Sequence, residues 1–165
     1  MSFHPSLTDK QIALIERSHL FFVASAHPQM ENSPKGEGPV NLSPKGGCPL
    51  HIIDPNTVAY LDYPGSGNET AHHIQAGGPV TVMVMSMDSE NAAIVRLYGK
   101  GRLESPDSQL AKKVHDAPAD HLANNPRQVF VVSIEKTQTS CGYGVPVYSF
   151  EGERTKEQRG RAYRD

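Results

Sequence analysis

The sequence has no tryptophan, only two cysteines, and no hydrophobic run long enough to cross a membrane as a helix. Its charge is nearly balanced, with 16 Lys and Arg against 18 Asp and Glu, so no global basic field attracts nucleic acid. The first residues, MSFHPSLTDK, lack the charged-then-apolar pattern of a signal peptide. We therefore expect a cytoplasmic protein in which Cys48 and Cys141 are reduced thiols.

The length of 165 residues suits one domain, which we place at residues 1–150. Residues 151–165, EGERTKEQRGRAYRD, mix basic and acidic side chains and are expected to be a charged tail, solvated or docked on a partner.

Apolar, β-branched stretches separated by Gly and Pro predict about six strands. They cover residues 20–26, 39–43, 57–62, 79–87, 94–103 and 127–135. Helical patterns cover residues 7–18, with Thr8 as N-cap, and 68–76, 110–115 and 118–124. Pro44 is expected to interrupt its strand, and Gly99 with Gly101 predicts a bulge. Short links between strands favour a mainly β fold, an antiparallel barrel with helices at its edges.

The stretch YPGSGNETAHHIQAGG, residues 63–78, allows three interpretations: a phosphate-binding loop, a turn before a capped helix, or a metal site at His72 and His73. Glycine-loosened backbone leading into a helix can cradle a phosphate, with Asn68 as helix cap and the Ser66 and Thr70 hydroxyls as donors. A turn followed by a capped helix explains the same residues without a ligand. A Walker A loop and a Rossmann fingerprint are both excluded, because the required Lys and third Gly are missing.

Metal and nucleophile sites have weaker support. His72 and His73 are adjacent, so on a helix they diverge and cannot hold one metal ion as an i, i+4 pair does. Cys48 and His51 have a usable spacing but no second pair of ligands nearby. Cys141 would need a histidine beside it to act as a nucleophile, and nothing local supplies one.

The stretch VNLSPKGG, residues 40–47, places polar side chains where a strand would bury apolar ones. Alternation puts Asn41 and Ser43 on one strand face, which favours a polar-edged ligand in a barrel cleft. Lys45 adds a positive charge at the strand end, suited to a phosphate at residues 66–70 if the two segments adjoin. Taken singly, an exposed lysine in a turn explains it equally well.

Five stretches in this order resemble the FMN-binding split β-barrel proteins related to pyridoxamine 5′-phosphate oxidase. They are LFFVASA, VNLSPKGG, DPNTVAYLDYPGSGNETAHHI, VRLYGKGRL and SCGYGVP, and the resemblance covers about residues 7–150. It implies a six-stranded split barrel that forms a homodimer, with FMN in clefts at the subunit interface.

The resemblance also implies cofactor-binding residues. Asn41, Leu42, Ser43 and Pro44 would border the isoalloxazine ring, and Lys45 would take the phosphate end with the loop residues Ser66, Gly67, Asn68 and Thr70. Tyr63 and Arg96 would be further contacts, and Cys141, Gly142 and Tyr143 would close the cleft from the other subunit.

The sequence departs from the true oxidases at three places. Val40 and Ile94 stand where those oxidases are expected to have Arg and Gln, and the tail does not resemble their substrate-binding segment. We therefore expect an FMN-dependent oxidoreductase of another substrate, without an assigned catalytic residue. The alternatives are a non-catalytic protein that binds or senses a flavin, a deazaflavin or haem, with His72 and His73 as candidate axial ligands, and a purely structural domain.

Overall fold

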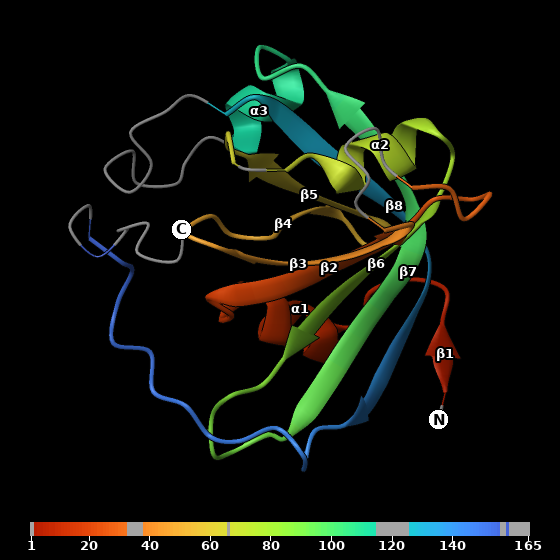
Figure 1. Cartoon of the computed structure of the whole chain (residues 1–165). Coiled ribbons are helices and arrows are strands. Elements are labelled where there is room, and N and C mark those ends of the chain that lie inside the picture. The colour runs from red at the N-terminus through yellow and green to blue at the C-terminus, as the bar shows by residue number, and fades with distance from the viewer. Residues whose placement is uncertain (1, 33–37, 66, 115–125, 156–157, 159–165) are drawn as a thin grey trace.

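The computed structural model describes residues 2–32, 38–65, 67–114, 126–155 and 158. Over these residues eight strands form one antiparallel sheet, with three short helices packed beside it (Figure 1). The strands are β1 (Phe3–His4), β2 (Leu20–Ala26), β3 (Val40–Gly46), β4 (His51–Asp54), β5 (Thr57–Asp62), β6 (Pro79–Met85), β7 (Ala93–Glu104) and β8 (Gln128–Cys141). The helices are α1 (Asp9–Glu16), α2 (Glu69–Gln75) and α3 (Gln109–Val114). The predicted mainly β split barrel is confirmed, and the two strands beyond the expected six are the short β1 and β4.

The sheet has the order β3-β2-β6-β7-β8-β5-β4, with β1 paired to β8. The long strands β7 and β8 form its centre, and their register shifts between Tyr98 and Gly99, which confirms the predicted bulge. An extra residue in one strand increases the local twist and bends the sheet. The curled sheet does not close, because β3 and β4, at the two ends of the order, are not paired with each other.

The core fills the inside of the curled sheet. Along β2 the buried and half-buried residues alternate, as expected for a strand with one face on the core. An aromatic group lies at the centre, where the Tyr60 and Phe130 rings stack with centroids 4.9 Å apart and Phe21 meets Tyr60 edge-on at 5.3 Å. This packing fixes β5 and β8 against β2.

The first helix forms where the sequence predicts it. Thr8 is the N-cap of α1, its side chain accepts a hydrogen bond from the Gln11 amide, and the Gln11 side chain accepts one from the Thr8 amide. This reciprocal pair satisfies two amides that the helix leaves without partners. Asn68 occupies the predicted N-cap position of α2, but its side chain makes no capping hydrogen bond. Its Oδ1 accepts from Gln128 Nε2 at 2.8 Å instead.

The prediction that Pro44 interrupts its strand is wrong. β3 continues to Gly46, and Pro44 lies opposite Phe22 of β2. In the described sheet β3 pairs with β2 alone, so one side of β3 needs no hydrogen-bond donors. Proline is tolerated on such an edge strand because the N–H that it lacks would have faced outward.

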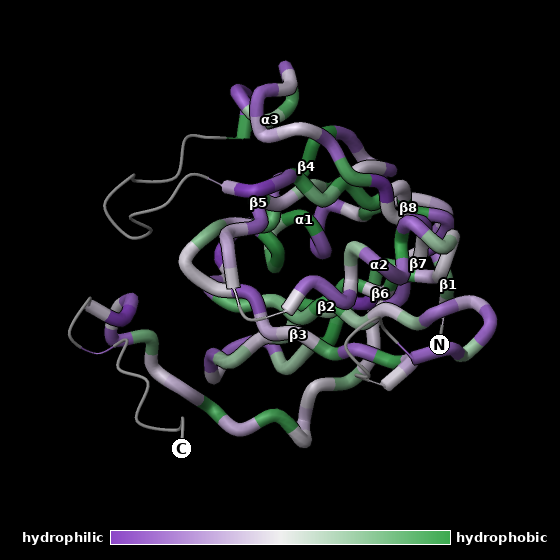
Figure 2. The backbone as a smooth tube through the Cα atoms, turned by 45° about the horizontal axis from the view of Figure 1, so that its top comes forward, coloured by the Kyte–Doolittle hydropathy of each residue, from purple (hydrophilic) through white to green (hydrophobic). Residues whose placement is uncertain are grey.

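After β8 the chain runs as an extended segment over residues 142–155. Figure 2 shows it as a pale tube with isolated hydrophobic residues. The Tyr148 amide donates to the Met87 carbonyl at 2.9 Å, and the Phe150 ring stacks on His19 with centroids 3.8 Å apart. The helix expected at 118–124 and most of the charged tail lie outside the described residues. None of the helices that the structure describes has the length and apolar character needed to span a bilayer.

Candidate functional site

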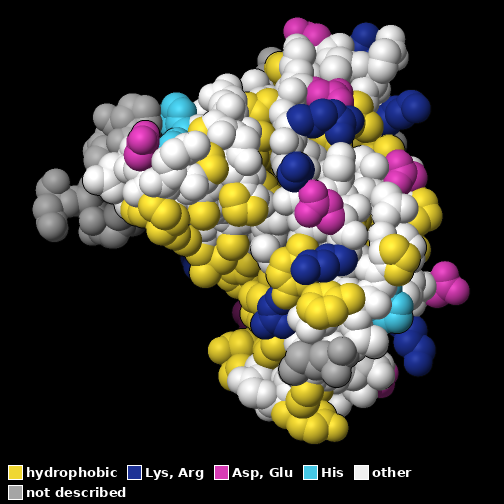
Figure 3. Space-filling view, turned by 90° about the vertical axis from the view of Figure 1, so that its right-hand side faces the viewer, with side chains coloured by type: hydrophobic (Ala, Val, Ile, Leu, Met, Phe, Trp, Pro, Cys, Tyr) yellow, Lys and Arg dark blue, Asp and Glu magenta, His cyan; other side chains and the backbone are white. Residues whose placement is uncertain are grey.

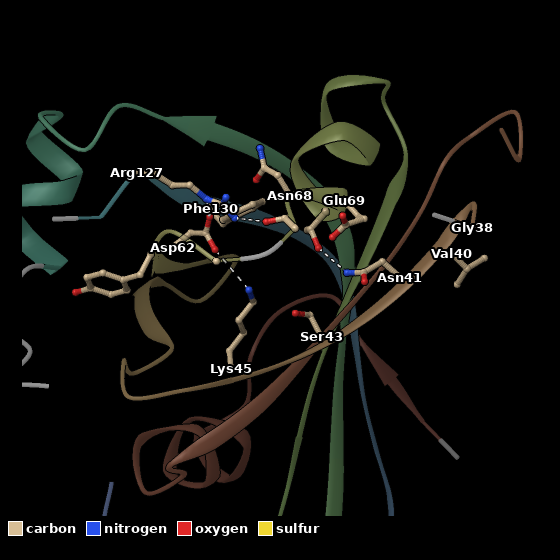
Figure 4. Close-up of a pocket in the computed structure, with 14 residues that line it drawn as sticks. Gly38, Val40, Asn41, Ser43, Lys45, Asp62, Asn68, Glu69, Arg127 and Phe130 are labelled. Carbon is tan, nitrogen blue, oxygen red and sulfur yellow. Dashed lines mark hydrogen bonds and ion pairs between the residues drawn. The ribbon is translucent and has the colours of Figure 1, made fainter. Parts of the chain in front are cut away.

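A cleft opens between the inner face of β3, the ends of β5 and β8, and the loop that leads into α2 (Figure 4). Its volume is about 490 Å³, within the range of small-molecule sites. Its described lining residues are Gly38, Val40, Asn41, Ser43, Lys45, Asp62, Tyr63, Gly65, Gly67, Asn68, Glu69, Thr70, Arg127 and Phe130. Segments 40–45 and 63–70, which the sequence analysis treated separately, thus line one cavity.

The floor of the cleft is the polar face of β3. Half-buried and exposed residues alternate along this strand, with Asn41, Ser43 and Lys45 on the half-buried face. Leu42 faces away from the cleft and is 64% exposed, and Val40, at the mouth of the cleft, is 61% exposed. The expected polar strand face is therefore present, and its hydroxyl, amide and ammonium groups can hydrogen-bond a ligand.

A buried carboxylate organises the charged end of the cleft. Asp62 is 4% exposed, and its Oδ2 accepts from Arg127 Nε at 2.6 Å and from Gln128 Nε2 at 2.8 Å. Lys45 Nζ lies 3.5 Å from the other oxygen, Oδ1. Arg127 also donates from Nη2 to the Gly67 carbonyl at 2.8 Å. One carboxylate thus positions two cations and connects the loop before α2 to the sheet.

The opposite end of the cleft is held by a hydrogen-bond chain. Asn41 Nδ2 donates to Thr70 Oγ1 at 3.0 Å, and Ser25 Oγ lies 3.5 Å from the same oxygen. Ser25 Oγ is also 2.9 Å from His73 Nδ1. Burial lowers the pKa of His73, and the neighbouring His27 lowers it further, so the His73 ring is held neutral at pH 7. The chain fixes the Asn41 side chain relative to α2.

Some of the predicted site residues line the cleft, others lie elsewhere, and one is not described. Asn41, Ser43, Lys45, Tyr63, Gly67, Asn68 and Thr70 line the cleft. Leu42 and Pro44 face outward from β3, and Ser66 lies outside the described residues. Arg96 lies elsewhere on the sheet, where its Nη1 donates to Ser140 Oγ at 2.8 Å. Cys141, Gly142 and Tyr143 lie at the far end of β8, outside the lining of this subunit's cleft.

The cysteine environments do not indicate nucleophiles or metal ligands. Cys48 is buried and its thiol donates to the Leu61 carbonyl at 3.5 Å. Burial raises its pKa to about 11, although Lys45 opposes the shift, so a thiolate does not form at neutral pH. Within the described ranges no group of three or more metal-ligating side chains comes together.

Sequence reasoning missed Asp62, Glu69 and Arg127 as site residues. Asp62 ends one strongly apolar strand and Arg127 directly precedes another, and these strands pair with Asp62 opposite Gln128. Two oppositely charged residues at the ends of two hydrophobic strands were a usable signal, but only after the pairing of those strands was known.

Comparisons with known proteins find relatives over most of the chain. The family model for pyridoxamine 5′-phosphate oxidase matches residues 7–141. The pyridoxamine 5′-phosphate oxidase family protein ustO of Aspergillus flavus is 36% identical over 148 residues, which are 88% of this chain and 56% of that protein. The chain thus spans a little over half the length of this relative.

Two solved structures share the fold at low identity. HupZ of Group A Streptococcus has a TM-score of 0.60 and 18% identity, over 79% of this chain and 91% of that one. An FMN-binding protein of Syntrophomonas wolfei has a TM-score of 0.59 and 15% identity, over 77% of this chain and 81% of that one. At these identities the likeness concerns the fold alone.

Proposed function

The chain belongs to the pyridoxamine 5′-phosphate oxidase family, and from this membership we propose that its cleft binds FMN as the cofactor of an oxidoreductase. The observation that carries the proposal is the convergence of the polar face of β3, the Gly67–Thr70 segment and Arg127 on one cavity. The FMN-binding neighbour with the same fold supports it.

The donors in the cleft fit a flavin nucleotide. Lys45 and Arg127 supply positive charge for the phosphate end, and Asn41, Ser43 and Thr70 supply hydrogen-bonding groups along the floor. Bound FMN supplies electron transfer at its ring system, while the residues of this chain orient it and limit access of water.

An absorbance titration tests cofactor binding. Purified protein is expected to be yellow, or to bind added FMN, and Lys45→Ala should weaken FMN binding about tenfold or more because a charge-assisted contact is lost. Lys100→Ala, which removes an exposed lysine on β7, should leave the affinity unchanged. A colourless protein that binds no FMN in the titration refutes the proposal.

Turnover is a separate part of the proposal. The bound flavin would be reduced chemically, and its reoxidation by oxygen or an added acceptor followed by the return of the absorbance of the oxidised flavin. Rapid reoxidation supports an oxidoreductase. A flavin that stays reduced points instead to a protein that stores or senses the cofactor.

We also infer that the protein is a homodimer with its clefts at the subunit interface. The outer face of β3 carries Leu42, which is 64% exposed behind the polar floor of the cleft, and Val40, 61% exposed, lies beside it at the mouth of the cleft. Hydrophobic side chains gather along one flank of the molecule in the space-filling view (Figure 3). An edge strand with such a face is a natural surface for a second copy.

Leu42→Lys should convert the dimer to a monomer. In a two-fold symmetric interface the substitution acts twice, and each lost Leu contact removes about 1.5–3 kcal/mol. Size-exclusion chromatography with light scattering measures the mass. Ile53→Lys, at a 40% exposed position on β4, is the matched control and should stay dimeric. If Leu42→Lys is also dimeric, the interface lies elsewhere, and a monomeric wild type refutes the dimer itself.

A further inference from the structure

His73 lies behind the wall of the cleft and is not among the described residues that line its cavity. It is on the buried side of α2 and is 1% exposed. Its Nδ1 lies 2.9 Å from Ser25 Oγ on β2, whereas its Nε2 is buried and has no hydrogen-bond partner in the described part of the chain. The polar contacts of the ring are therefore made at Nδ1, on the side that faces Ser25.

The surroundings of Nδ1 decide which ring nitrogen carries the proton of the neutral His73 ring. Burial lowers the pKa of His73, and a hydrogen bond with the Ser25 backbone partly opposes that shift. A bond that favours the charged ring is one in which the ring donates, so the Ser25 backbone offers an acceptor. A proton on Nε2 would be a buried donor without an acceptor, and it would leave the Nδ1 lone pair facing the backbone oxygen. These contacts assign the proton to Nδ1.

The position of this proton sets the direction of the hydrogen-bond chain toward the cleft. With Nδ1 protonated, Ser25 Oγ accepts from His73, and its own hydrogen is left for Thr70 Oγ1, 3.5 Å away. The same Thr70 oxygen accepts from Asn41 Nδ2 at 3.0 Å, and Figure 4 shows Asn41 reaching from β3 toward the start of α2. Two neighbours then donate to Thr70 Oγ1, so the hydroxyl hydrogen of Thr70 turns away from both. Thr70 lines the cleft, where a ligand can accept this hydrogen.

We propose that His73 is a positioning residue, whose Nδ1–H keeps the Thr70 hydroxyl turned into the cleft as a donor to an acceptor atom of the bound flavin nucleotide. This inference rests on the proposed flavin binding and deepens it. His73 acts through Ser25 and Thr70, because its own ring does not line the cavity. A hydroxyl that is oriented before the ligand arrives loses less rotational freedom on binding, which strengthens the complex.

Two measurements test the inference. The first is nuclear magnetic resonance of the full chain with ¹⁵N-labelled histidine, which distinguishes the two neutral tautomers by the shifts of the ring nitrogens. The His73 signals are assigned through the backbone resonances of α2. The ring is expected to be the Nδ1–H tautomer at neutral pH, both without FMN and with it.

The second measurement is a double-mutant cycle on FMN affinity, followed by titration. His73→Leu and Thr70→Val should each weaken FMN binding about fivefold, the effect of one hydrogen bond. The double variant should bind no more weakly than Thr70→Val alone, because His73 acts through the Thr70 hydroxyl. His73→Asn supplies a side-chain N–H near the position of Nδ1 and should keep the wild-type affinity within about a factor of two. His72→Leu, at the neighbouring half-buried position of α2, is the control and should leave the affinity unchanged.

Either of two results overturns the inference while leaving the proposed function intact. One is an Nε2–H tautomer of His73 in a protein that binds FMN, which decides the matter even if the variants do not fold. The other is a double variant whose loss of affinity is the product of the two single losses, as expected if His73→Leu merely loosens α2. If the wild type binds no FMN, the proposed function fails and the inference fails with it, whichever tautomer is found.

Discussion

Arg127→Met is expected to lower the free energy of unfolding by about 3 kcal/mol, because removing one partner of a buried ion pair leaves the other charge uncompensated. Asp62 is 4% exposed and Arg127 makes its shortest contact, at 2.6 Å. Lys45 and Gln128 remain beside Asp62, which keeps the loss near the lower end of the usual range. Urea denaturation followed by circular dichroism measures the effect.

Two comparisons show whether the uncompensated Asp62 carboxylate causes the loss of stability. Adding Asp62→Asn to Arg127→Met should recover about 1 kcal/mol or more, since the uncompensated charge is then gone. Arg17→Met makes the same substitution in the exposed Arg17–Asp88 pair, where each side chain is 42% exposed, and should cost less than about 1 kcal/mol. Equal losses in Arg127→Met and Arg17→Met would show that Asp62 does not depend on Arg127.

Gly99→Ala is expected to destabilise the protein by about 3 kcal/mol through steric overlap with backbone. A Cβ at this position would collide with the Ser133 carbonyl oxygen and lie 2.9 Å from its carbonyl carbon. Backbone in the centre of the sheet cannot move aside as a flexible side chain does. The bulge between Tyr98 and Gly99 would have to open, which loosens the pairing of β7 and β8.

The control for this prediction is Gly144→Ala. A Cβ at residue 144 meets nothing within 4 Å, so the free energy of unfolding should stay within about 0.5 kcal/mol of the wild type. Both variants are compared by urea denaturation. A Gly99→Ala protein as stable as Gly144→Ala would mean that the two strands tolerate a side chain between them.

Most secondary structure was predictable because its causes are local. The apolar run of β2, the alternating pattern of β5 and the Thr8 cap of α1 each depend on residues within a few positions of one another. Pro44 was misjudged because its tolerance depends on β3 being an edge strand, a property of the whole sheet. Asn68 is the predicted N-cap of α2, but its side chain bonds Gln128, far away in the sequence, instead of the helix.

The candidate site was predictable only in part. The resemblance marked Asn41, Ser43, Lys45 and the loop before α2, and these residues line one cavity. It also marked Arg96, which instead bonds Ser140. The ion pair between Asp62 and Arg127 joins residues 65 positions apart, and it forms because β5 and β8 pair in one particular register.

The sequence by itself determined the strands, the polar side chains on the inner face of β3 and the membership of the chain in its family. Each is encoded in the type and order of neighbouring residues. The tertiary structure alone decided how three ionisable side chains, Lys45, Asp62 and Arg127, meet at one end of a cleft. The energy of such charges depends on their separation and burial, and both are set by strand register and sheet curl rather than by position in the chain.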